Sequence, residues 1–265
     1  MRTRTKTIFL ILLLILSSAT VFAQSTSYTV PRKVALERAA KREFREWWLT
    51  TARYPGLVPE QFFPIGWSKD GKFAYYVEPV DEACGCYFAN LFIQDMRTDK
   101  VLWEFKYSQD DDIDPKTGDM LGQSDIRKLW AKNQKLFSDK LSENGIVASR
   151  ATLLGKAFTV GGRSYTAKAI TKMGKNPDYG GERVDRLTFT LSSPRLGTKT
   201  LYTADHSKEE YWFTLDAGVI GVIKSPFEDR VAVVGMEVNR GWEGPPHNGD
   251  VLIAGADLTS GFVKK

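Results

Sequence analysis

The chain has 265 residues, of which 42% are hydrophobic and 12% aromatic, a composition that excludes an intrinsically disordered protein. It carries 37 Lys and Arg residues against 32 Asp and Glu residues. Three of the positive charges, Arg2, Arg4 and Lys6, belong to the first six residues, and without them the chain is close to neutral. We therefore expect no nucleic-acid partner. Two cysteines exclude a scaffold that depends on several disulfides.

Residues 1–23 are predicted to be a cleavable signal peptide. The positive N-terminus precedes an unbroken apolar run from Ile8 to Leu16, and a stretch of small residues then ends at Ala23. The run is too short for a bilayer span, which needs about 20 apolar residues. We expect export through the Sec route, a mature chain that begins at Gln24, and a periplasmic or extracellular location. No membrane span is expected after cleavage.

The first half of the mature chain is predicted to hold a helix and a β-meander. Apolar residues recur on one face of the expected helix 32–53, and Pro55-Gly56 ends it. Four aromatic and β-branched segments separated by turn residues follow as expected strands, at 62–68, 72–77, 87–94 and 101–107.

An acidic segment, 110–119, separates the meander from a second helix. Asp110, Asp112 and Asp114 alternate as in calcium loops, but the Gly and Glu that an EF-hand requires are replaced by Pro115 and Leu121. We interpret the segment as a solvated linker and leave calcium binding open. The following helix is expected over 125–144, with Ser124 as its N-cap and Gly145 in a left-handed conformation after its end. From 157 to 257 the pattern indicates about eight short strands.

Two segments of the chain resemble each other. The first is 65–76 with 93–98, and the second is 222–234 with 255–261. In each, a strand ends at a serine, an acidic turn follows, a strand departs, and a later strand closes with Asp-Met or Asp-Leu. These residues define an internal repeat.

The first copy is similar to the β-propeller repeat of the TolB and WD40-like class. The residues that carry the likeness are Trp67-Ser68-Lys69-Asp70-Gly71-Lys72, with Lys69 where that repeat has proline. The second copy has one extra residue and lacks the glycine. The chain also resembles a group of bacterial secreted proteins of unassigned activity, so the resemblance implies a blade-like sheet and no reaction. A closed propeller needs four to eight blades, and the chain has room for three.

The expected fold class is therefore α+β and mainly antiparallel: a blade-like meander, one or more C-terminal antiparallel sheets and two covering helices, without propeller closure. The expected segments are 1–23 (signal peptide), 24–109 (helix and meander), 110–148 (acidic loop and helix) and 149–265 (C-terminal β region). The last segment and 24–109 could pack as one domain.

Two loops are the candidate functional sites, because loops held by a rigid sheet commonly carry function. Each joins the second and third strands of one repeat, and the alternative is that their Pro and Gly residues only shape the connections. The candidate residues are Glu78, Asp81, Glu82, Cys84 and Cys86 in the first loop and Glu237, Trp242, Glu243 and His247 in the second.

The pair Cys84 and Cys86 has several interpretations. A disulfide across one residue is strained and so could be redox-active, and two thiolates fall short of the four ligands of a closed zinc site. We expect a local disulfide or two small thiols, without a metal or cofactor.

Sequence signatures of hydrolases, P-loops and dinucleotide-binding folds are absent. We therefore expect a non-enzymatic protein that binds another envelope or secreted protein, with Trp242 and Tyr87 as part of an apolar contact patch. The alternative is an exported hydrolase that uses loop carboxylates, and a thiol redox protein is a third reading.

Overall fold

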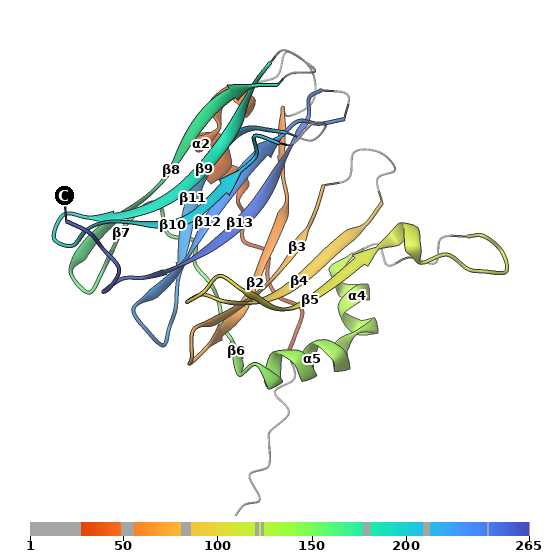
Figure 1. Cartoon of the computed structure of the whole chain (residues 1–265). Helices are drawn as coiled ribbons and strands as arrows, with labels where there is room; N and C mark the ends of the chain where they lie inside the picture. Colours follow the sequence, from red (N-terminus) through yellow and green to blue (C-terminus); the bar gives the residue numbers. More distant parts are fainter. Residues whose placement is uncertain are drawn as a thin grey trace, which may run out of the picture.

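The computed structural model describes residues 28–48, 56–80, 86–119, 122, 125–176, 181–208, 213–242 and 244–264. Within these ranges the chain is mainly antiparallel β-structure, arranged in three open sheets with short helices around them (Figure 1). The predicted fold class is confirmed, and the sheets do not close into a propeller. The predicted signal peptide lies outside the described residues.

The predicted meander forms a five-stranded sheet. Its order is β5-β4-β3-β2-β6, and every neighbouring pair is antiparallel. The strands are β2 (Gln61–Ser68), β3 (Lys72–Glu78), β4 (Phe88–Asp95), β5 (Val101–Ser108) and β6 (Ile146–Ala148). The four expected strands thus appear within one residue of their predicted bounds, and β6 is added after the second helix.

The C-terminal sheet has the order β1-β13-β12-β11. Its strands are β1 (Leu57–Pro59), β11 (Thr214–Lys224), β12 (Arg230–Asn239) and β13 (His247–Asp257). The edge strand β1 comes from the N-terminal part of the chain and runs parallel to β13. It occupies the place that β5 has in the first sheet, so the second repeat receives its fourth strand from far away in the sequence.

The third sheet has the order β10-β9-β8-β7 and is entirely antiparallel. Its strands are β7 (Ala157–Val160), β8 (Arg163–Lys175), β9 (Glu182–Ser193) and β10 (Gly197–Asp205). Seven strands therefore lie between 157 and 257 in the described residues, and several are long, where about eight short ones were expected. Gly161 and Gly162 form the turn between β7 and β8.

The two predicted helices are each broken. The first appears as α2 (Glu37–Glu43) and α3 (Arg45–Trp48), and the second as α4 (Ile126–Lys132) and α5 (Gln134–Glu143). The N-cap of α4 is Asp125, whose carboxylate accepts hydrogen bonds from the backbone of residues 127 and 128. The expected N-cap, Ser124, lies outside the described residues. A short 3-10 helix, η1 (Gln109–Asp111), follows β5.

Three apolar cores stack the elements in layers. One core joins the β7–β10 sheet to the C-terminal sheet, a second joins the C-terminal sheet to the five-stranded sheet and α2, and a third joins the five-stranded sheet to α4 and α5. The C-terminal sheet is covered on both faces, which explains why β12 reads Val-Ala-Val-Val-Gly-Met over its buried length.

The two repeats have similar local hydrogen bonds. The Ser68 hydroxyl accepts the backbone N–H of Lys72, at the start of β3, and the Ser225 hydroxyl accepts that of Phe227, in the turn before β12. The closing residues, Met96 and Leu258, are both 1% exposed, and each donates its backbone N–H to a carbonyl of that turn. The sequence likeness therefore corresponds to a shared hairpin geometry.

Candidate functional site

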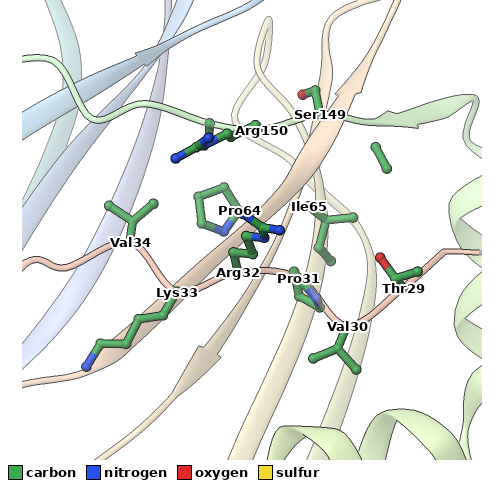
Figure 2. A pocket seen from close by; sticks show the side chains of 12 residues that line it. Thr29, Val30, Pro31, Arg32, Lys33, Val34, Pro64, Ile65, Ser149 and Arg150 are labelled. Atoms are coloured by element: carbon green, nitrogen blue, oxygen red, sulfur yellow. The ribbon is translucent and has the colours of Figure 1, made fainter.

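A cationic groove lies beside β2, between two segments without regular secondary structure (Figure 2). Its volume is about 510 Å³. One wall is formed by residues 29–34 and the other by residues 148–151, and Pro64 and Ile65 of β2 form the base. We refer to it as the β2 groove.

The first wall is held at both of its ends. At one end the Tyr28 side chain is buried, its hydroxyl donates to the carbonyl of Ile146, and its own carbonyl accepts from Trp130 Nε1 of α4. At the other end Val34 forms an antiparallel bridge with Phe62 of β2. The segment between them spans the edge of the sheet, so its position follows from packing at both ends.

The second wall is fixed by the end of β6. Residues 146–148 pair with β2, and Ser149 N–H donates to the carbonyl of Ile65. Between this bond and the Val34 bridge lies Pro64, which has no N–H and stands next to a bulge in the β2–β3 pairing. The edge of β2 is therefore incompletely paired where the groove opens.

The groove is lined by positive residues and by no carboxylate within the described part of the chain. Arg32 and Arg150 are exposed and lie on opposite sides of Pro64, whereas Lys33 points outward (Figure 2). Lys33 Nζ bonds to Glu37 Oε1 at 2.8 Å, which neutralises it. The arginines leave a positive potential in the groove, which suits an anionic ligand.

The first predicted loop begins at a chain of hydroxyl groups. Tyr87 Oη donates to Glu78 Oε1 at 2.8 Å, and the hydroxyls of Tyr76 and Tyr87 are hydrogen-bonded. Burial raises the pKa of the Glu78 carboxyl, and the bond from Tyr87 opposes part of that effect. Asp81, Glu82 and Cys84 lie outside the described residues, so their predicted roles stay predictions.

Cys86 is disulfide-bonded. Its Sγ lies 3.0 Å from Oδ1 of Asp110, and since a disulfide sulfur carries no proton this is a contact and not a hydrogen bond. Cys84 is the other cysteine of the sequence. In the acidic segment that follows, the Asp112 carboxylate accepts hydrogen bonds from Lys132, at 3.0 Å, and from the hydroxyl of Tyr107.

The second predicted loop joins β12 to β13 and lies at the opposite end of β12 from the turn that follows Ser225. The His247 ring packs edge-on against Trp47 of α3, with ring centroids 5.5 Å apart, and its Nδ1 accepts from the backbone N–H of Gly241. Trp242 is 68% exposed, and Glu243 lies outside the described residues. His247 is therefore a packing residue, and Trp242 is the accessible one.

Glu237, near the end of β12, contacts a residue that sequence analysis did not single out. Its Oε1 lies 2.8 Å from Nε2 of His206, at the end of β10, and both side chains are 11% exposed. The structure thus pairs Glu237 with a histidine of the neighbouring sheet. Glu78 lies in the five-stranded sheet within its own hydrogen bonds, so these two predicted carboxylates do not form one acid–base pair.

A second group that sequence reasoning missed is Glu60, between β1 and β2. Its Oε2 accepts from the backbone N–H of Val251 at 2.7 Å. Burial, reinforced by the charge of Asp250, raises the pKa of Glu60 to about 8. The one signal in the sequence is its position between two apolar strands. That signal is weak, because an acidic residue at a strand boundary usually marks a solvated turn.

The arginines of the groove had no sequence signal either, because Arg32 and Arg150 are 118 positions apart and neither belongs to a motif. No group of three or more His, Cys, Asp or Glu side chains in the described ranges could hold a metal ion. Among the described helices, none is long and apolar enough to cross a lipid bilayer.

Comparisons of the chain with protein-family models, with curated proteins and with solved structures found no match. The likeness of residues 67–72 to the TolB and WD40-like repeat therefore stays a prediction.

Proposed function

We propose that this protein is an exported, non-enzymatic binding protein that holds an extended acidic segment of another envelope or secreted protein in the β2 groove. The observation that carries the proposal is the lining of the groove, where Arg32 and Arg150 face a volume of about 510 Å³ without a carboxylate among the lining residues. Charge complementarity of this kind selects the partner and speeds its association.

The form of the partner follows from the edge of β2. The groove runs beside a strand whose pairing is interrupted at Pro64, between Val34 and Ser149. An extended segment fits a groove that follows a strand, and its alternate side chains can reach the two walls. Acidic side chains at those positions would meet the two arginines.

The test is selection from a phage-displayed library of random peptides against the chain from Gln24 onward. We expect enrichment of acidic peptides whose binding, measured by fluorescence anisotropy, weakens about 10-fold or more when salt is raised. The double variant Arg32→Ala/Arg150→Ala should weaken that binding by at least about 10-fold, as for the loss of two charged contacts of modest strength.

The matched control is Arg163→Ala/Arg195→Ala, which removes two exposed arginines that do not line the groove. The proposal fails if the selected peptides are not acidic, or if both double variants lose binding equally. The export part is tested separately by the mass of the secreted product: a chain that begins at Gln24 supports it, and an intact N-terminus in the cell fraction contradicts it.

A further inference from the structure

Strand β5 forms an open edge of the five-stranded sheet. In the part of the chain that the structure describes, no other strand pairs with its outer side (Figure 1). The other long edge strands are each bridged by a further segment: β11 exchanges two backbone hydrogen bonds with Leu154, through Val222, and β10 does so with Val263, through Thr198. The edge strands β1, β6 and β7 have only three or four residues, whereas β5 has eight. An open edge of this length offers its backbone N–H and C=O groups to another strand.

The side chains of β5 alternate between the two faces of the sheet. Trp103, Phe105 and Tyr107 are partly buried against the core that includes α4 and α5. Glu104 and Lys106 therefore point to the opposite face, where Lys106 Nζ bonds to Glu104 Oε1 at 3.1 Å. The Lys106 side chain is 70% exposed. The strand thus presents aromatic residues on one face and one charge of each sign on the other.

Symmetry limits how two such edges can join. Two copies whose β5 strands become antiparallel neighbours are related by a twofold axis perpendicular to the sheet. This axis keeps each face of the sheet on its own side, so aromatic residues oppose aromatic residues and charged residues oppose charged residues. The axis then lies between the two copies of one residue, which sets the register.

The charges select one of these registers. With the axis at Phe105, Glu104 of each copy opposes Lys106 of the other, and Trp103 opposes Tyr107. With the axis at Glu104 or at Lys106, two like charges oppose each other. Among the registers centred within 103–107, the stretch that follows the bulge in the β4–β5 pairing, only the one at Phe105 places opposite charges across from each other. Opposite charges and aromatic side chains are favourable cross-strand pairs.

We propose that the β5 edge is a homodimer interface, in which two copies of this chain join their five-stranded sheets into one antiparallel sheet centred on Phe105. A lysine on an edge strand usually opposes such pairing, but here Lys106 meets the Glu104 carboxylate of the second copy. The inference does not rest on the proposed function, because β2 and its groove lie on the other side of the sheet from β5.

Sedimentation velocity of the chain from Gln24 onward, measured over a range of protein concentrations, tests the proposal. We expect monomers below about 1 μM and dimers at about 100 μM, because a short strand pair buries less area than a standard interface and so binds weakly. Glu104→Lys and Lys106→Glu each place like charges across from each other twice. Each variant should raise the dissociation constant of the dimer by at least about 10-fold.

The two variants together provide the sharpest result. An equimolar mixture of Glu104→Lys and Lys106→Glu should form a heterodimer, because every lysine of one copy then opposes a glutamate of the other. The double variant Glu104→Lys/Lys106→Glu exchanges the charges and should dimerise as the wild type does. The matched controls are Lys168→Glu and Glu182→Lys, at exposed residues of the β7–β10 sheet, and they should leave dimerisation unchanged.

Circular dichroism establishes that each variant is folded. If a single variant does not fold, the salt dependence of the wild-type dimer decides, because the attraction between Glu104 and Lys106 weakens at high salt. A chain that stays monomeric at every concentration, a dimer that responds to neither the charge changes nor salt, or a mixture that remains monomeric would overturn the proposal.

The dimer and the proposed function can fail independently. Lys106→Glu changes no residue that lines the β2 groove, so a monomeric variant that still binds the selected acidic peptides leaves the groove proposal intact. A wild-type dimer that binds no acidic peptide contradicts the groove proposal alone.

Discussion

At the scale of single residues, Glu60 shows how a junction between sheets changes an ionisation. Its backbone N–H donates to the carbonyl of Gly249 and its carboxyl accepts from Val251, so both ends are bound to β13. Burial and the nearby Asp250 raise its pKa from about 4.5 to about 8. The native state therefore binds this proton more tightly than the unfolded chain does.

This pKa shift predicts how stability depends on pH. The contribution of protonated Glu60 is complete below about pH 4.5 and is lost as pH rises through 8, because only the unfolded chain ionises freely in that window. Glu60→Gln keeps an acceptor for Val251 without the charge. Because Glu60 keeps partial access to solvent, we expect the variant to be only about 1 kcal/mol more stable than the wild type at pH 8, and nearly equal at pH 4.5.

Urea unfolding at both pH values checks this. The control is Glu104→Gln, at a carboxyl of β5 that pairs with Lys106 near the surface. A stability difference for Glu60→Gln that is the same at both pH values would contradict the assigned pKa.

At the scale of elements, the ends of the second helix show which signals in a sequence are sufficient. Gly145 follows the C-cap of α5 with a φ of 66°, as predicted, and its N–H donates to the carbonyl of Ser142. The break at Asn133 was not predicted, because the apolar stripe continues across it from Trp130 to Phe137. Periodicity gives the face of a helix but not its straightness.

Gly145 supplies a prediction at this scale. Gly145→Ala should destabilise the protein by about 1–2 kcal/mol, since the left-handed conformation costs that much for a residue with a Cβ atom, although the new methyl meets nothing closer than 4.0 Å. Gly145→Asn should cost less, because asparagine tolerates this conformation. Thermal unfolding of the two variants distinguishes backbone strain from a packing clash, which would penalise asparagine more.

At the scale of the whole molecule, the sheets meet through close backbone contacts. A Cβ atom at Gly255 of β13 would lie 2.0 Å from the carbonyl oxygen of Met96, in the turn between β4 and β5. The same turn binds the C-terminal sheet through Arg230, whose guanidinium donates to the Met96 carbonyl at 2.8 Å. The turn therefore joins the two repeats.

Gly255→Ala should consequently cost about 2–3 kcal/mol, because backbone atoms cannot yield as a side chain can. The control is Gly181→Ala, where a Cβ atom would meet nothing within 4 Å and where stability should change by less than about 0.5 kcal/mol. Chemical denaturation measures both. Similar values for the two variants would show that the sheets adjust to each other without strain.

Contacts of this kind explain what the sequence could and could not predict. The strands of the meander follow from local turn chemistry around Gly71 and Asp99, so their bounds were predictable. The assembly of the β2 groove depends on Tyr28 reaching α4 and on Ser149 reaching β2, and such long-range contacts leave no periodic pattern.

The parallel pairing of β1 with β13 also constrains the order in which the molecule can form. Leu57 pairs with His247, about 190 positions later, so this edge of the C-terminal sheet stays open until β13 is present. Pairings this distant slow folding, because the loop between them must close first. A chain interrupted before β13 would leave β1 without a neighbour and α2 without the completed sheet beneath it. The C-terminal sheet can therefore be completed only after β13 has been synthesised.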